Sequence, residues 1–205
     1  MASRTVVTPN RRGMKSRELV LDAAERVMAT DGFEAATLAR VVAESGIPMS
    51  SVYHYYGSKD GILLTVMERG AERFFADLPN PDRRVGSAAE HLRQVVATAV
   101  ATLERHPSFL RLLIVFAIQP PRSDAGAVDA VVGRVRELAL GRLRKQISIA
   151  FDEDPGAVRI DQLARFALAA FDGAFVAWQT DPGAMLGRLL APLPAALVAA
   201  RRALK

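Results

Sequence analysis

Apolar residues recur at three- and four-residue spacing along most of the chain, which is the period of helices with one buried face. In the first such stretch, residues 14–31, they are Leu19, Val20, Ala23, Ala24, Val27 and Met28. The same spacing predicts further long helices at residues 88–105, 109–118, 128–151 and 158–179. Residues 185–204 are also apolar but contain Pro192 and Pro194, so we expect a kink or two short helices there. No segment alternates with the two-residue period of a strand, and the predicted fold class is all-α.

Residues 37–59 predict a helix-turn-helix followed by the start of another helix. Thr37 fits the N-cap of the first short helix, which ends before Gly46. Pro48 fits the first position of the second helix, because its missing N–H would be unpaired there anyway. Lys59 opens the helix that follows. In such a motif the second helix lies in the major groove of DNA, so this segment is a candidate DNA-binding element.

A more specific pattern runs through residues 14–67. Its parts, in order, are Ala23-Ala24, Asp31-Gly32-Phe33, Thr37, Ser45-Gly46-Ile47, Val52-Tyr53-His54-Tyr55-Tyr56 and Ser58-Lys59-Asp60. In this order and spacing they resemble the tetracycline-repressor (TetR) family of bacterial transcription regulators, whereas the C-terminal part resembles it only in length and helical character. The resemblance implies an all-α chain with an N-terminal three-helix, helix-turn-helix DNA-binding domain and a C-terminal helical bundle for effector binding and dimerisation. We therefore expect three parts, which are a flexible basic arm at 1–13, the DNA-binding domain with a connecting helix at 14–78, and the effector-binding and dimerisation domain at 79–205.

The residue types around the second helix of the motif suggest which side chains contact DNA. Thr37 would present a hydroxyl and backbone N–H groups to a phosphate. Tyr53 and His54 have polar tips that donate to phosphate oxygens, and Lys59 adds a positive charge at the other side of the groove. Contacts with base edges are expected from the start of the helix, at Met49, Ser50 and Ser51. The alternatives are a place in the core for the tyrosines, which we expect for Tyr56, and a plain surface position for His54.

Three residues depart from the family pattern. Pro48 stands where a serine often caps the second helix, and Val42 stands where a small alanine is usual. Arg40 occupies a position that is often acidic in the family. We expect it to pair with Glu44 four residues further on; the alternative is a phosphate contact. These departures leave open which bases are read.

The aromatic residues of the C-terminal part concentrate on two predicted helices, and the resemblance implies an effector pocket within this bundle. The candidate lining residues are Phe109, Leu113, Phe116, Phe171, Phe175 and Trp178. Ordinary core packing is the alternative for any one of them. Few charged residues interrupt these segments, so we expect a small, largely apolar or aromatic ligand. The polar groups that could orient it are His106, Gln146, Asp172 and Gln179.

Residues 166–178 are apolar on nearly every side of their predicted helix, so they must be covered almost completely. A homodimer through the last two long helices, which the resemblance also implies, would cover them. The alternative is a central helix within the core of a single chain.

The chain has 27 basic and 22 acidic residues, and its net charge of +5 is compatible with nucleic acid without being diagnostic. Residues 1–17 hold five basic residues and no acid, whereas residues 18–60 hold three basic and seven acidic residues. A basic arm beside a helix-turn-helix could reach along or across a groove; a solvated leader is the alternative. The chain has no cysteine, which excludes disulfides, and no uncharged apolar run of the roughly 18 residues that a membrane helix needs. We expect a cytoplasmic protein without a membrane partner.

Together these patterns predict a ligand-responsive, sequence-specific DNA-binding transcription regulator, and specifically a repressor that a small-molecule effector releases from a double-stranded DNA operator. A helical adaptor that has kept the fold but not specific DNA binding is the alternative function. A small helical enzyme is the least favoured, because the chain lacks a Gly-rich phosphate loop, a nucleophile elbow and a zinc-type histidine pair. We expect no catalytic residue, no cofactor and no metal site.

Overall fold

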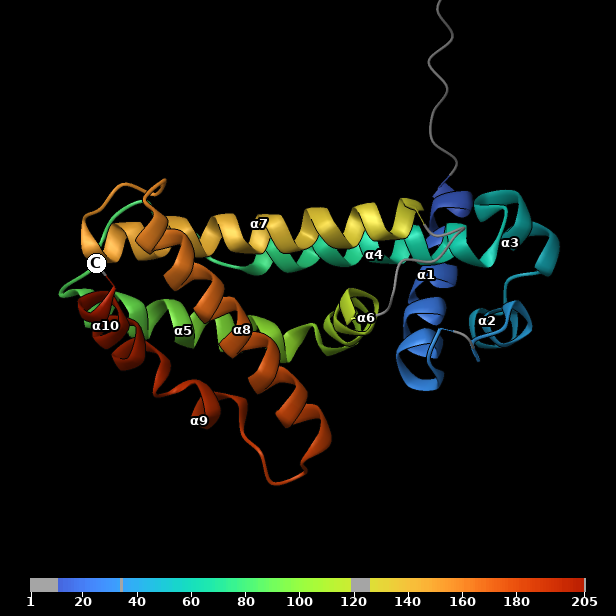
Figure 1. The fold of residues 1–205 in the computed structure, drawn as a ribbon. Coiled ribbons are helices and arrows are strands. Elements are labelled where there is room, and N and C mark those ends of the chain that lie inside the picture. Colours follow the sequence, from blue (N-terminus) through green and yellow to red (C-terminus); the bar gives the residue numbers. More distant parts are fainter. Residues whose placement is uncertain (1–10, 34, 119–125, 205) are drawn as a thin grey trace, which may run out of the picture.

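The structure is a computed structural model that describes residues 11–33, 35–118 and 126–204. Over these residues the chain forms ten α-helices and no strand (Figure 1). The helices are α1 (Arg11–Asp31), α2 (Leu38–Ser45), α3 (Met49–Tyr56), α4 (Lys59–Asp77), α5 (Ala88–Arg105), α6 (Pro107–Ile118), α7 (Gly126–Phe151), α8 (Val158–Thr180), α9 (Leu186–Leu190) and α10 (Leu193–Ala203). This part of the chain has the all-α fold class that the sequence predicted.

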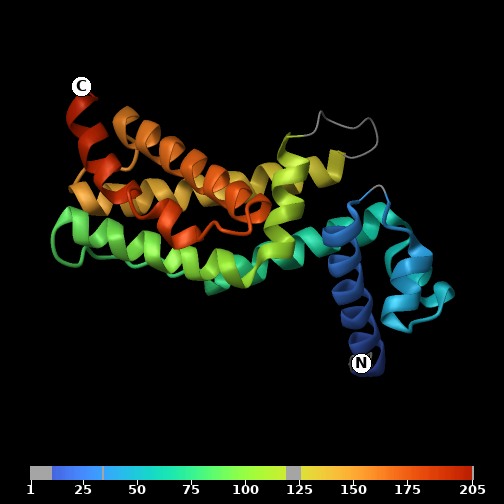
Figure 2. The same ribbon diagram turned by 90° about the horizontal axis from the view of Figure 1, so that it is seen from below.

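The helices form an elongated molecule in which α4 connects the two ends (Figures 1 and 2). Helices α1, α2 and α3 pack together at one end, and α5 and α7–α10 form a bundle at the other. Helix α4 starts beside α3, packs against α1 and runs on into the bundle, where it lies along α7 (Figure 1). Helix α6 lies at the junction, because it contacts α1 and α4 as well as α7. Two helices, α4 and α6, therefore join the N-terminal unit to the bundle.

Most predicted helix limits agree with the structure, and the main exception is the start of α1. This helix begins at Arg11, so residues 11–13 belong to it and not to the predicted flexible arm. Those residues are two arginines and a glycine, and a turn without an apolar residue gives no hydrophobic period by which to detect it. The rest of the predicted arm, residues 1–10, lies outside the described residues. At the other end, the two prolines separate α9 from α10, as predicted.

The short helices of the N-terminal unit begin and end at residues suited to those positions. The Thr37 hydroxyl accepts a hydrogen bond from the backbone N–H of Arg40 at 3.2 Å, which confirms Thr37 as the N-cap of α2. Gly46 ends α2 in the left-handed region, at a φ of +68° that glycine adopts without steric cost. Pro48 occupies the N-cap of α3, one residue before the first helical position where it was predicted. These signals fix the turn between α2 and α3.

Helix α3 is held against α1 by its inner side. Val52 is buried, with 1% of its surface exposed. Tyr56 is half-buried, and its hydroxyl donates to the backbone carbonyl of Arg17 in α1 at 2.9 Å. Burial raises the pKa of Tyr56 to about 12, so the hydroxyl stays protonated and keeps donating at neutral pH. The prediction that Tyr56 is a packing residue agrees with these contacts.

Helix α1 is fixed to α4 by charges gathered around Arg69 of α4. The Arg69 side chain is only 10% exposed, and its guanidinium contacts carboxylates of Glu18, Asp22 and Glu25 at 2.9, 2.8 and 3.0 Å. These three acids follow one another at four- and three-residue spacing, so they share one face of α1. Arg73, one turn further along α4, also reaches Glu18, at 3.2 Å, but is half-exposed. We call these five residues the α1–α4 ion-pair cluster.

Close packing of rings joins α6 to the rest of the junction. Gly70 of α4 lies against the ring of Phe109, and a Cβ at position 70 would come within 2.3 Å of the ring's Cδ2 atom. Further along α6, Phe116 packs edge-on against Phe33, with 5.5 Å between ring centroids. Phe33 lies two residues after the end of α1. The buried side of α6 is therefore packed against both α4 and the end of α1.

Candidate functional site

The outer side of α3 carries most of the predicted DNA contacts. Ser50, Tyr53 and His54 are exposed, and Tyr53 keeps 52% of its surface accessible. Their spacing of three and four residues places them on one face of the helix. Met49 and Ser51 are half-buried beside this face. An exposed row of hydroxyl and imidazole groups on a short helix can donate to phosphates and to base edges.

Two predicted phosphate contacts flank α3. Thr37 is exposed at the N-terminus of α2, and because its oxygen accepts from a backbone N–H, its O–H is still able to donate. Lys59 is the first residue of α4, and its Nζ lies 4.2 Å from the centroid of the Phe33 ring. This cation–π contact holds the ammonium group at the start of α4. Both residues lie in the same compact unit as α3.

The acidic residues of this unit are mostly taken up by internal ion pairs. Arg40 pairs with Asp31 at 3.1 Å, and Glu44 pairs with Arg26 at 3.0 Å. The predicted pair between Arg40 and Glu44 is therefore wrong. Helices α1 and α2 pack closely, so each charge on α2 meets an opposite charge on α1 instead of its neighbour four residues away. Together with the α1–α4 ion-pair cluster, these pairs reduce the negative charge that the unit presents to a polyanion.

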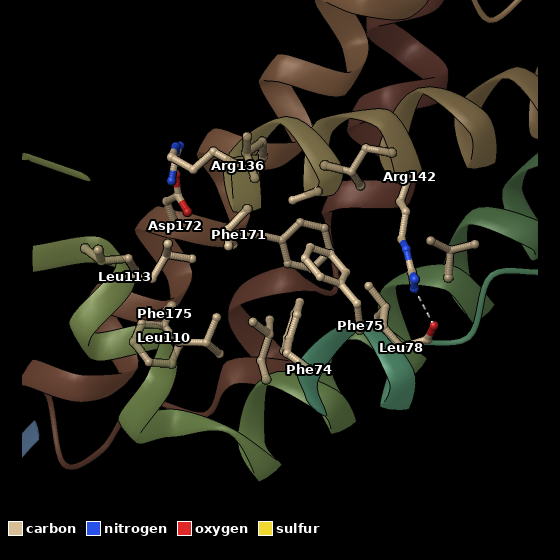
Figure 3. Close-up of a pocket in the computed structure, with 18 of the residues that line it drawn as sticks. Phe74, Phe75, Leu78, Leu110, Leu113, Arg136, Arg142, Phe171, Asp172 and Phe175 are labelled. Atoms are coloured by element: carbon tan, nitrogen blue, oxygen red, sulfur yellow. Dashed lines mark hydrogen bonds and ion pairs between the residues drawn. The ribbon is translucent and has the colours of Figure 1, made fainter. Parts of the chain in front are cut away.

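The C-terminal bundle contains an apolar cavity of about 100 Å³ between α4, α5, α6, α7 and α8 (Figure 3). Its wall is mainly aromatic and aliphatic, and includes Phe74 and Phe75 of α4, the C-cap residue Leu78, Leu110 and Leu113 of α6, and Phe171 and Phe175 of α8. A cavity walled in this way selects apolar ligands. The C-terminal end of α4 thus forms one of its walls.

Three of the six predicted pocket residues line this cavity, namely Leu113, Phe171 and Phe175. The other three do not. Phe109 and Phe116 are buried in the junction against α4 and Phe33. Trp178 packs edge-on against Phe175, with 5.7 Å between ring centroids, and is not part of the cavity wall. Aromatic content located the right helices, but the sequence could not give the rotation of each helix about its axis, which decides the rings that face the cavity.

Polar groups lie at two ends of the cavity (Figure 3). At one end, the Arg136 guanidinium of α7 pairs with the Asp172 carboxylate of α8 at 2.7 Å. At the other end, Nη1 of Arg142 donates to the backbone carbonyl of Leu78 at 2.8 Å. Gln146 also contributes to the wall. Of the polar groups predicted to orient a ligand, Asp172 and Gln146 are therefore at the cavity.

The remaining two predicted orienting groups have structural partners elsewhere. His106 lies 2.9 Å from the Asp77 carboxylate at the end of α4, and its hydrogen bond holds the pKa of Asp77 below its usual value. Gln179 accepts a hydrogen bond from Nη2 of Arg111 at 2.6 Å. The other terminal nitrogen of Arg111 donates to the carbonyl of Ala29 in α1 at 2.8 Å. Arg111 of α6 thus bridges α8 and the end of α1.

Sequence reasoning missed the contribution of α4 to the cavity. Phe74, Phe75 and Leu78 stand at the end of a helix that was assigned mainly to the DNA-binding domain. The signal was present, because two adjacent aromatic residues one turn before a proline-containing loop need a core that the three short N-terminal helices do not supply. Arg136 and Arg142 were missed because α7 is rich in basic residues, and spacing alone does not separate paired from unpaired ones.

Residues 20–66 match the family model of the bacterial regulatory proteins of the tetR family. The matched segment contains all of α2 and α3, the second half of α1 and the beginning of α4. This segment is a helix-turn-helix DNA-binding domain of the tetR-family type. The chain that carries it is accordingly a transcription regulator.

Comparisons over longer stretches agree with this assignment of the N-terminal segment. Over 163 residues, 80% of this chain, the sequence is 22% identical to the HTH-type transcriptional regulator BetI of Brucella canis, of which 79% is covered. A tetR-family transcriptional regulator from Streptomyces coelicolor has the same fold, with a TM-score of 0.72, 18% identity, and coverage of 93% of this chain and 83% of that one. The regulator FadR from Bacillus subtilis in complex with stearoyl-CoA is similar with a TM-score of 0.65, 18% identity, and coverage of 89% of this chain and 98% of that one.

The part of the chain that the structure describes offers neither a cluster of metal ligands nor a helix that could span a membrane. In residues 11–33, 35–118 and 126–204, no three His, Asp or Glu side chains are grouped so that they could hold a metal ion. Within the same ranges, no helix has the length and apolar character needed to cross a membrane. The helix-turn-helix surface and the apolar cavity are candidate sites for DNA and for a small ligand, respectively.

Proposed function

We propose that this regulator is a repressor whose sequence-specific binding to an operator is released by a small, largely apolar effector in the cavity of the bundle. One observation carries the proposal. Helix α4 begins with Lys59 beside α3, and at its other end Phe74, Phe75 and the C-cap residue Leu78 lie in the cavity wall. A single helix therefore links the proposed ligand to the proposed DNA surface.

The size of the cavity supports a coupling between the two sites. Its volume of about 100 Å³ is below the roughly 300–1,000 Å³ of typical sites for drug-sized ligands. A drug-sized ligand is larger than this cavity, so its binding must push the surrounding helices apart. Helix α4 is one of these helices. Arg111 adds a second connection, because it joins α8 to the carbonyl of Ala29 in α1. The ligand then favours an arrangement of α1 and α4 that differs from the DNA-bound one, and this difference is the coupling free energy.

A homodimer completes the proposed mechanism. Helix α8 exposes a stripe of residues at three- and four-residue spacing, consisting of Phe166, Ala169, Gly173 and Val176. Phe166 and Val176 keep 47% and 44% of their surface accessible, which is a large exposure for apolar side chains on one helix face. The proposed partner is the same face of a second chain, with α10 beside it. Such a dimer presents two α3 helices to successive major grooves, about 34 Å apart along the DNA.

The proposed contacts follow the placement of the side chains. Thr37, Tyr53, His54 and Lys59 bind phosphates and orient the unit, whereas base edges are read by the residues that open α3, Met49, Ser50 and Ser51. We place the regulator in the bacterial cytoplasm, where its operator lies. For the effector, the FadR complex with stearoyl-CoA supports an apolar molecule, because a regulator of similar fold holds a ligand with a long hydrocarbon chain.

The first test is a mobility shift with DNA from upstream of the chain's own coding sequence and with random DNA of equal length. At physiological salt, upstream DNA should bind at least about a thousandfold more tightly than random DNA. Equal affinity for both would refute specific repression there. Failure to bind any genomic fragment would favour the adaptor function instead.

The second test concerns Lys59. Lys59→Ala should weaken binding to all sequences alike and lower the slope of log affinity against log salt concentration by about one per subunit. Lys145→Ala is the matched control, because Lys145 pairs with Asp82 in the distant bundle. An unchanged slope for Lys59→Ala would contradict the phosphate contact.

A further inference from the structure

We propose that the effector is an amphipathic acid, with one carboxylate bound by Arg142 and an apolar body in the cavity. The inference rests on the proposed function, because it assigns the chemical class of the ligand to the same cavity. The wall of this otherwise apolar cavity carries the positive charge of Arg142.

Arg142 carries a positive charge that no acidic side chain balances. Its guanidinium donates to the Leu78 carbonyl and lies 4.9 Å from the centroid of the Phe75 ring. No carboxylate among the described residues forms an ion pair with it. Of the five N–H donors of a guanidinium, the carbonyl of Leu78 accepts from one nitrogen only. Burial lowers the pKa of Arg142, which means that its surroundings oppose the charge.

The other arginines of the bundle that lie against the core differ in this respect. Arg136 also lines the cavity, but it pairs with Asp172. Arg144, two residues beyond Arg142 on α7, contacts both Glu137 and Asp161. A charge taken out of water without a counter-ion is costly. A ligand carboxylate in the cavity would supply the missing partner, with the planar geometry that guanidinium recognises by two parallel hydrogen bonds.

The two ends of the cavity differ, and this difference limits the ligand to one acidic group. Figure 3 shows Arg142 and Leu78 at one end and the Arg136–Asp172 pair at the other, with the rings of Phe171 and Phe75 between them. At the second of these ends, the Asp172 carboxylate already neutralises the positive charge of Arg136. A second carboxylate there would lie beside Asp172 and be repelled. The geometry therefore fits a monocarboxylic acid with its apolar part extending away from Arg142.

Arg142 also connects the ligand's acidic group to α4. The carbonyl that Arg142 holds belongs to Leu78, the C-cap residue of α4. A carboxylate that binds Arg142 competes with this carbonyl for the guanidinium, because a charged acceptor forms the stronger hydrogen bond. Binding of the acid thus changes the restraint on the end of the helix whose first residue is Lys59.

The experiment compares dodecanoic acid with dodecanol, dodecanamide and dodecanedioic acid on the full-length protein. Binding is followed by calorimetry and by the fluorescence of Trp178, the single tryptophan of the chain, whose ring packs on Phe175 of the cavity wall. The monoacid should bind about ten- to a hundredfold more tightly than the alcohol and the amide. The diacid should bind more weakly than the monoacid.

Variants at Arg142 test the assignment of the carboxylate. Arg142→Met keeps the length of the side chain and should abolish the preference for the acid over the alcohol. Arg142→Lys keeps the positive charge and should retain most of the preference for the acid over the alcohol. Arg144→Gln is the matched control on the same helix and should bind like the wild type. Circular dichroism checks that each variant is folded, and Arg142→Lys serves as the second variant if Arg142→Met unfolds.

Three results would overturn the inference. They are equal binding of acid and alcohol by the wild type, an acid preference that survives in Arg142→Met, and a lack of binding by every compound of the series. Operator binding is measured in the same samples without ligand, so a failure of the ligand class is distinguished from a failure of the proposed DNA-binding function.

Discussion

Replacing Arg69 by methionine should loosen the attachment of α1 to α4 while keeping the length and most of the apolar contact of the side chain. The substitution leaves the carboxylates of Glu18, Asp22 and Glu25 facing a neutral group. Those carboxyl side chains are 55%, 42% and 22% exposed, respectively, so water can solvate the first two more easily than the third. The loss of folding free energy therefore differs among the three contacts.

The magnitude follows from these exposures. The contacts with the two more exposed acids resemble surface ion pairs and contribute about 0.5 kcal/mol each. The contact with Glu25 is mostly shielded from water and contributes about 1.5 kcal/mol, in the range of hydrogen bonds to charged groups. Arg69→Met should therefore lower the free energy of unfolding by about 2–3 kcal/mol. The three acids, now without their common partner, also repel one another along α1.

The assay is urea unfolding followed by circular dichroism at one fixed protein concentration, because a dimer's stability depends on concentration. Arg73→Met is the matched control, since Arg73 contacts Glu18 and Asp22 but is 51% exposed. Arg73→Met should lower the free energy of unfolding by less than about 1 kcal/mol. If Arg69→Met costs no more than Arg73→Met, the buried guanidinium is not what fixes α1 to α4, and the reasoning is refuted.

Three further predictions concern the bundle and the junction. Hydrogen bonds from Arg159 and Arg201 hold the pKa of Glu153 below its usual 4.5, so its stabilising contribution is complete above that pH and is lost as pH falls through the lowered value. Thermal unfolding measured between neutral and acidic pH should therefore depend less on pH in Glu153→Gln. Gly70→Ala should destabilise the junction by about 1–3 kcal/mol in urea unfolding, because the added methyl group overlaps the adjacent ring of α6. Phe166 lies in the proposed dimer interface, so the wild type should sediment as a dimer and Phe166→Glu as a monomer in analytical ultracentrifugation; a dimeric variant would place the interface elsewhere.

Local signals in the sequence were sufficient for most of the helix limits. Thr37 predicted the start of α2 because an N-cap needs only its own hydroxyl and a backbone N–H three residues away. The helix predicted at residues 88–105 has the same limits as α5. At its start, the side chains of Ser87 and Glu90 each accept a hydrogen bond from the other residue's backbone N–H. The start of α1 was placed three residues too late because its first turn has no apolar residue. Limits set by local chemistry are therefore predictable, whereas unmarked turns are not.

Contacts between helices were much less predictable. Arg40 has an acid four residues away in the sequence, yet it pairs with Asp31 across the α1–α2 contact. The sequence also predicted that Phe109 lines the ligand pocket. In the structure its ring packs closely against Gly70 of α4, so it lies in the junction instead. Conversely, Phe75 was not expected to line the cavity. Each of these depends on how one helix is rotated against another, and the hydrophobic period of a single helix does not contain that information.

The central claim is that the state of the cavity sets the affinity for the operator through α4, and it can be tested without knowing the effector. Ala139 of α7 lines the cavity, so the larger side chain of Ala139→Phe takes up its space and presses on the surrounding helices, as the proposed ligand does. Operator affinity is measured by fluorescence anisotropy, with Ala130→Phe on the exposed side of α7 as the control. The account predicts that folded Ala139→Phe binds the operator at least about tenfold more weakly than both the control and the wild type, which corresponds to a coupling of about 1.4 kcal/mol. A folded Ala139→Phe protein that binds the operator as tightly as the wild type would contradict it.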